Sequence, residues 1–196
     1  MKKLFLGLKF IAHFIVKPSS SCFSVVEKVC LKELEKHSND LFVMLFLAEH
    51  YVQSKKYDEA CILLESLLEL GANRKEVILL LSKIYFNLQQ YKQIKQLFAN
   101  FDVLSDKDTA NYYLGYSLIE LGKRKEGIKY LNSYLKYHSE DWLVFSFIGY
   151  QYFKEGLYDI ALEAYTKADR LNPSKKEIEK SIEMCKEKLK TQQGHC

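Results

Sequence analysis

The sequence of 196 residues is poor in turn-forming residues, with only 2 prolines and 8 glycines. A β-sandwich or barrel of this length would need more of them, and so would a glycine-rich nucleotide-binding fold. No apolar run reaches about 18 residues, which argues against an ordinary transmembrane helix. The composition is 48% hydrophobic and 28% charged, which is typical of a folded globular chain.

Cysteine spacing gives no sign of a disulfide framework or of a metal site. The five cysteines are Cys22, Cys30, Cys61, Cys185 and Cys196, an odd number at irregular intervals. No pair of cysteines or histidines has the spacing of a zinc site. We therefore expect a cytoplasmic protein without metal or cofactor, because a reducing compartment is the simplest setting for free thiols.

Positive charge is concentrated in the first seventeen residues, which hold Lys2, Lys3, Lys9 and Lys17 and no acidic residue. The whole chain has 29 basic and 25 acidic residues, so the rest has 25 of each and is neutral. Phosphate binding needs a clustered basic surface. The neutral body of the chain therefore argues against nucleic acid as the main ligand.

Catalytic motifs are missing from the sequence. Gly122 and Lys123 lack the glycine-rich lead and the following hydroxyl residue of a phosphate loop. Neither a Gly-x-Ser-x-Gly nor a His-Glu-x-x-His pattern is present. The sequence therefore predicts a protein that is not an enzyme.

An internal repeat dominates the chain. Residues 41–74, 75–107, 108–141 and 142–175 form four stretches of 34, 33, 34 and 34 residues. Each has an apolar stripe of helical period, a short polar break and a second such stripe. A small residue recurs within the first stripe, at Ala48, Ser82, Gly115 and Gly149.

The fourth stretch has the most complete pattern: Phe145, Ile148, Gly149, Tyr152, Gly156, Tyr158, Ala161, Tyr165, Ala168 and Pro173. These stretches resemble the tetratricopeptide repeat, a helix–turn–helix unit of about 34 residues. The resemblance covers residues 41–175. It implies an all-α fold, a right-handed α-solenoid of tandem units with flanking N- and C-terminal helices. The second stretch departs from the pattern, with Gln89 for the turn glycine and Ile94 for a small residue.

The flanks of the array also have helical patterns. Ser24 and Glu27 have the spacing of a capping box in residues 18–40, expected to form a helix of a degenerate first repeat. Ser174 and Glu177 have the same spacing before residues 176–190, expected to form a capping helix with an apolar stripe from Ile178 onwards. Residues 191–196 are expected to be a disordered tail.

The pattern of residues 1–17 predicts a basic amphipathic helix, for which there are three hypotheses. The helix packs on the array and completes a repeat, it lies at a membrane interface, or it is a signal segment. In the second case Lys2, Lys3, Lys9 and Lys17 contact the membrane or a partner, and the protein is peripheral to that membrane. The three interpretations stay open at this point.

The resemblance implies that the first helix of each repeat lines a concave groove. The expected partner-binding residues there are Phe42, Leu45, Glu49, Leu79, Lys83, Phe86, Tyr112, Tyr116, Ile119, Tyr150 and Phe153. Such an aromatic-rich surface suits a helical or extended apolar segment of a partner. The Lys, Asn and Arg clamp of chaperone-binding relatives is replaced by Leu45, Glu49, Leu80, Thr109 and Tyr113, which cannot grip a carboxylate.

The sequence thus predicts a non-enzymatic protein–protein interaction module, either an adaptor or chaperone-like. The alternative is a membrane-associated or self-assembling scaffold that uses the basic N-terminal helix. The sequence is compatible with a homo-oligomer. A further alternative concerns the groove itself, whose aromatic residues either face a partner or pack against a neighbouring repeat or the N-terminal helix. If the groove is open, Tyr116→Ala with Tyr150→Ala should weaken binding without unfolding the array.

Overall fold

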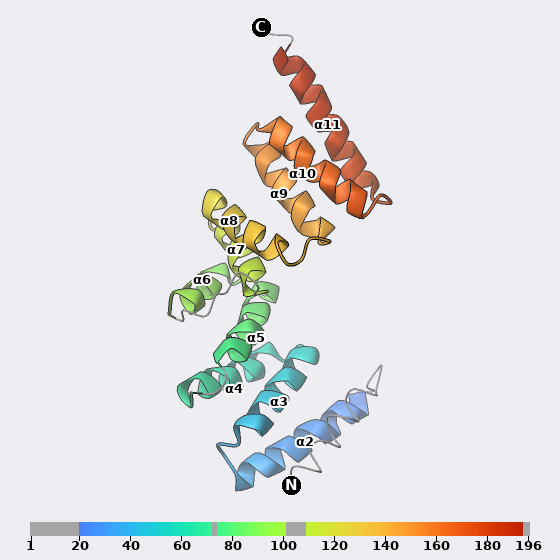
Figure 1. Ribbon diagram of the computed structural model, residues 1–196. Helices are drawn as coiled ribbons and strands as arrows, with labels where there is room; N and C mark the ends of the chain where they lie inside the picture. The colour runs from blue at the N-terminus through green and yellow to red at the C-terminus, as the bar shows by residue number, and fades with distance from the viewer. Residues whose placement is uncertain (1–19, 72–73, 101–108, 194–196) are drawn as a thin grey trace. The chain divides into compact units, whose positions relative to one another are not determined.

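The computed structural model describes residues 20–71, 74–100 and 109–193. Within these ranges the regular secondary structure is entirely helical (Figure 1). The helices are α2 (Ser20–Lys36), α3 (Leu41–Gln53), α4 (Tyr57–Glu69), α5 (Arg74–Asn87), α6 (Tyr91–Asn100), α7 (Ala110–Glu120), α8 (Arg124–Leu135), α9 (Trp142–Lys154), α10 (Tyr158–Leu171) and α11 (Lys176–Gln193). The predictions for residues 1–17 concern a segment outside the described residues.

The chain divides into two compact units, residues 1–87 and 88–196. The boundary falls inside the expected second repeat, 75–107. In the first unit α3 and α4 form a hairpin, against which α2 and α5 pack. In the second unit the hairpins are α7/α8 and α9/α10, with α6 against α7 and α11 along α10 (Figure 1).

The core of the first unit comes from the apolar stripes of its helices. Leu47, Leu64, Ile78 and Leu81 are at most 1% exposed. Ala48 is fully buried, as expected for the small residue of the first repeat, because a small side chain lets two helices approach closely. Burial of these apolar stripes is the main force that holds the helices together.

A polar brace joins α2 to the α3/α4 hairpin in the first unit. The Glu27 carboxylate accepts hydrogen bonds from the Lys56 ammonium at 2.9 and 3.0 Å and from the Tyr51 hydroxyl at 3.1 Å. The Lys56 hydrogen bond lowers the pKa of Glu27 despite partial burial. The capping box expected at Ser24 and Glu27 was wrong, because α2 already begins at Ser20 and Glu27 lies inside the helix.

In the second unit two glycines allow α7 and α8 to cross in backbone contact. A Cβ atom on Gly115 would lie 2.8 Å from the carbonyl oxygen of Gly127 and 2.9 Å from Cγ of Leu131. One on Gly127 would collide with the carbonyl oxygen of Gly115. Leu131 is fully buried beside this crossing. The close approach expected from Gly115 is therefore present.

The hairpin turns share one backbone motif, in which a residue of positive φ ends the first helix. Gly122 and Gly156 have φ of 81° and 76°, and Lys55 adopts 60° at the corresponding turn of the α3/α4 hairpin. In each turn the next amide donates to a carbonyl five residues back, as from Lys56 to Tyr51 at 2.9 Å. This is the Schellman arrangement, in which the left-handed position favours glycine.

We expect Lys55→Gly to raise the free energy of unfolding of the first unit by about 1 kcal/mol. A non-glycine residue in the left-handed region costs about 1–2 kcal/mol, and glycine at this position removes that strain. Part of the gain in stability is lost again, because glycine has a larger conformational entropy in the unfolded chain. Urea denaturation followed by circular dichroism measures the change. The mirror substitution Gly122→Ala should destabilise the second unit by a similar amount. A neutral or destabilising Lys55→Gly would contradict the strain argument.

The fold class predicted from the repeat is confirmed: the described chain is all-α and built of helical hairpins. Among the described helices none combines the length and the apolar character needed to cross a membrane.

Candidate functional site

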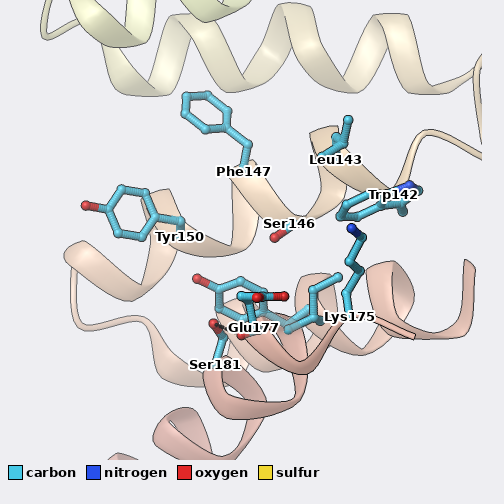
Figure 2. Close-up of a pocket in the computed structure, with 10 residues that line it drawn as sticks. Trp142, Leu143, Ser146, Phe147, Tyr150, Lys175, Glu177 and Ser181 are labelled. Atoms are coloured by element: carbon cyan, nitrogen blue, oxygen red, sulfur yellow. Dashed lines mark hydrogen bonds between the residues drawn. The ribbon is translucent and has the colours of Figure 1, made fainter. Parts of the chain in front are cut away.

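A cleft of about 540 Å³ opens on the second unit between α9 and α11 (Figure 2). Its walls are mostly aromatic and aliphatic, with two serine hydroxyls and two opposite charges among them. The lining residues are Trp142, Leu143, Ser146, Phe147, Tyr150, Tyr165, Lys175, Glu177, Ile178 and Ser181. A concave, largely apolar surface with a few polar groups is the usual form of a binding site.

The first wall of the cleft is α9, whose start is fixed by Asp141. The Asp141 carboxylate accepts a hydrogen bond from the backbone amide of Val144 at 3.3 Å and thereby caps the helix. It also accepts a hydrogen bond from the Tyr134 hydroxyl at 3.0 Å. Tyr134 lies near the end of α8, so this carboxylate ties the start of α9 to the preceding hairpin. The positions of Trp142 and Leu143 follow from that anchor.

The floor of the cleft is Tyr165 of α10, which is 5% exposed. Its ring packs under α9 where Gly149 leaves room, since a Cβ there would lie 3.1 Å from ring atoms. Burial raises the pKa of Tyr165 to about 12. Tyr165 therefore stays neutral and serves as packing surface at physiological pH.

The second wall is α11, held on α10 by its apolar stripe. Ile178 and Cys185 are 3% and 0% exposed, and Ile182 packs beside them. The expected apolar face of this helix is thus confirmed, and the helix runs to Gln193, beyond the expected end at 190. The remaining sides of α11 face outward, and its first turn borders the cleft with Glu177.

The capping box expected at Ser174 and Glu177 is replaced by another arrangement. The Ser174 hydroxyl donates to the side-chain oxygen of Asn172 at 2.9 Å. The carbonyl of Lys175 accepts the first amide bond of the helix, from Ile178 at 2.9 Å. In the described chain no amide of the first turn donates to the side chain of Ser174 or Glu177, and Glu177 lines the cleft instead (Figure 2).

The rim of the cleft exposes large apolar side chains. Leu143 is 60% exposed and Tyr150 is 49% exposed. The Lys154 ammonium lies 5.2 Å from the centre of the Tyr150 ring, and the Lys175 ammonium 5.5 Å from that of Trp142. These are cation–π distances, so both ring faces already attract positive charge.

Of the residues expected to bind a partner, Tyr150 lines this cleft and Phe153 lies half-buried further along α9. In the first unit Phe42 and Lys83 are exposed, and the other expected residues are half-buried: Leu45, Glu49, Leu79 and Phe86. Ile119 is a correction. It is 7% exposed and belongs to the hydrophobic core, because its side chain packs beside Gly127 at the α7/α8 crossing.

Tyr112 and Tyr116 lie in an aromatic cluster between helices of the second unit. The Tyr116 ring stacks on Phe147 of α9, with centroids 4.5 Å apart and planes at 16°, and lies 6.1 Å from Tyr91 of α6. Tyr112 contacts Tyr134 of α8 at 5.5 Å. Burial raises the pKa of Tyr112 and Tyr116 above the ordinary value. Tyr116 thus packs against neighbouring repeats, and Tyr112 packs against the second helix of its own repeat.

Most of the α11 wall was not among the predicted groove residues, although the repeat length indicates it. Adding 34, the length of the fourth repeat, to Leu143 and Phe147 gives Glu177 and Ser181. Both belong to the cleft. The capping helix therefore continues the register of the first helices of the repeats, and it supplies a second wall as a fifth copy would.

The titratable groups of the described chain show no activated nucleophile. Burial raises the pKa of the Cys30 and Cys61 thiols to about 11, so both stay protonated at neutral pH. A reactive thiol needs a shift in the opposite direction. Within the described residues no cluster of three or more His, Cys, Asp or Glu side chains could hold a metal ion.

Comparison with known proteins is consistent with this architecture. The model of the family described as anaphase-promoting complex, cyclosome, subunit 3 matches residues 53–134. No curated protein sequence matches the chain. Among solved structures, a MamA protein superimposes with a TM-score of 0.70 and 21% identity, over 76% of this chain and 82% of that one. YrrB, described as a TPR protein with an unusual peptide-binding site, superimposes with a TM-score of 0.68 and 19% identity, over 85% of this chain and 86% of that one.

A further MamA structure, MSR-1, has 25% identity and a TM-score of 0.61 over 79% of this chain and 87% of that one. Helical hairpins with small residues at their crossings define a helical-repeat fold. The fold is of the tetratricopeptide-repeat type, as the sequence predicted.

Proposed function

We propose that this chain is a non-enzymatic adaptor that binds an apolar segment of a partner protein, helical or extended, in the cleft between α9 and α11. The observation that carries the proposal is the exposure of Leu143 and Tyr150 on the rim of a mainly apolar cleft. Exposed apolar patches of this kind mark interaction sites when polar groups surround them. The peptide-binding site named for YrrB supports the same use of a fold of this type.

The cleft is preformed, which favours binding. Asp141 caps α9, and the buried side chains of Ile178 and Cys185 hold α11 in place. The cleft therefore loses little conformational entropy when a ligand binds. Six of its ten lining residues are aromatic or aliphatic. A short segment with two or three apolar anchors should therefore bind with a Kd of about micromolar.

The test is a selection of random 15-residue displayed peptides on the full chain, followed by titration of the synthetic winners. Trp142 is the single tryptophan of the chain and lines the cleft, so its fluorescence reports binding there directly. We expect the selected peptides to be rich in apolar residues. We expect Leu143→Asp to lower their affinity for the chain about tenfold, since it puts a charge on a contact surface.

The matched control is Ile62→Asp, the same kind of change at a side chain 65% exposed in the first unit. It should leave the titration unchanged, and both variants should unfold at the same urea concentration as the parent chain. Equal affinity of the winners for the parent and for Leu143→Asp would exclude this cleft as the binding site.

A further inference from the structure

The cleft between α9 and α11 contains two charged side chains that do not pair with each other. The Lys175 ammonium is turned to the Trp142 ring, 5.5 Å from its centre, at one end of the cleft. Figure 2 draws Glu177 between Ser146 and Ser181, away from that ring. Within the described residues, no ion pair or side-chain hydrogen bond is formed by the Glu177 carboxylate.

The aromatic walls add to the effect of this carboxylate. Ring faces carry partial negative charge, so they attract cations and disfavour anions. Trp142 and Tyr150 each already have a lysine ammonium over the ring, and Phe147 and Tyr165 add two further rings to the lining. A carboxylate without a cationic partner among four aromatic residues is complementary to a positive side chain.

We infer that the cleft selects apolar segments that carry a lysine or arginine, and that this side chain pairs with the Glu177 carboxylate. The inference rests on the proposed function and specifies the chemistry of its ligand. Acidic segments are disfavoured because Glu177 and the ring faces repel them, while Lys175 already lies over the Trp142 ring and Lys154 over the Tyr150 ring. The ligand chemistry is thus opposite to that of a site that grips carboxylates.

The test repeats the displayed-peptide selection on the parent chain, on Glu177→Gln and on Glu177→Lys. We expect lysine or arginine to be enriched at one position among apolar residues on the parent chain, to lose this enrichment on Glu177→Gln, and to give way to aspartate or glutamate on Glu177→Lys. The control is Glu179→Lys, an exposed residue of the same helix outside the cleft lining, which should select the same peptides as the parent.

Affinity gives the second readout. The best peptide and its Lys→Gln form, titrated through Trp142 fluorescence, should differ about fivefold on the parent chain, the upper end of what one exposed ion pair contributes. On Glu177→Gln the two peptides should bind alike, with the affinity of the neutral peptide preserved. Loss of the neutral peptide as well would show damage to the cleft and would overturn the role given to this carboxylate.

The outcomes separate the two proposals. Peptides selected without a basic preference, or with a preference that survives Glu177→Gln, would overturn this inference and leave the proposed function standing. An acidic preference would assign recognition to Lys175 instead. Failure to select any peptide that shifts Trp142 fluorescence would overturn both. Self-association of the parent chain in sedimentation, abolished by Glu177→Gln, would assign the cleft to a second copy and overturn the peptide assignment.

Discussion

Gly127→Ala is expected to lower the free energy of unfolding of the second unit by about 3 kcal/mol, at the upper end of the usual cost of overpacking. The added methyl group would collide with the backbone carbonyl oxygen of Gly115 and lie 2.6 Å from Cγ1 of Ile119. A carbonyl cannot rotate away as a side-chain end can. Helices α7 and α8 would have to separate, and the packing of the buried Leu131 would loosen with them.

Urea denaturation followed through Trp142 fluorescence measures this change, because the single tryptophan lies in the second unit. Lys129→Ala is the matched control. It adds an alanine to the same helix at an exposed position, and it should change the free energy of unfolding by less than about 0.5 kcal/mol. A loss below 1 kcal/mol for Gly127→Ala would show that the two helices have room to adjust.

The sequence predicted the architecture because the repeat encodes it redundantly. Small residues return at Ala48, Ser82, Gly115 and Gly149, and each is buried or faces a close neighbour in the structure. One such match is weak evidence, whereas constant spacing across tandem copies requires one packing solution for all of them. The left-handed turn at Lys55 escaped this reasoning, since no glycine marks it and the turn is imposed by the hairpin.

Local motifs were less reliable than the repeat. Ser24 with Glu27 and Ser174 with Glu177 both have the spacing of a capping box, but neither glutamate caps its helix. Glu27 bonds to Lys56, 29 residues away in sequence, and Glu177 lines a cleft. A spacing of three residues records only that two side chains share a helix turn, and tertiary partners decide what each one binds.

The candidate site was only partly predictable for a related reason. The repeat alignment places Tyr116 and Tyr150 at equivalent positions, yet Tyr150 is 49% exposed while Tyr116 stacks on Phe147. The difference comes from the neighbouring helix of the next unit. For Tyr116 this helix is α9, which contributes Phe147, and for Tyr150 it is the C-terminal helix α11. Alignment assigns a face to a residue, but the side chains of the next helix decide whether that face stays open.

Tyr116→Ala is therefore expected to destabilise the second unit by about 2 kcal/mol, less than a fully buried aromatic residue costs. The substitution removes the stack on Phe147 at 4.5 Å and the contact with Tyr91 at 6.1 Å. Tyr116→Phe keeps the ring, so we expect it to cost less than about 1 kcal/mol. Urea denaturation monitored at Trp142 distinguishes the two.

Tyr150→Ala completes the comparison, because it is the same change at the equivalent position one repeat later. It should leave the free energy of unfolding within about 0.5 kcal/mol of the parent while weakening peptides bound in the cleft. The double alanine substitution of both tyrosines would then mix a loss of packing with a loss of contact surface. If Tyr116→Ala instead kept full stability and weakened peptide binding, Tyr116 would be a groove residue, and its stack on Phe147 would not stabilise the fold.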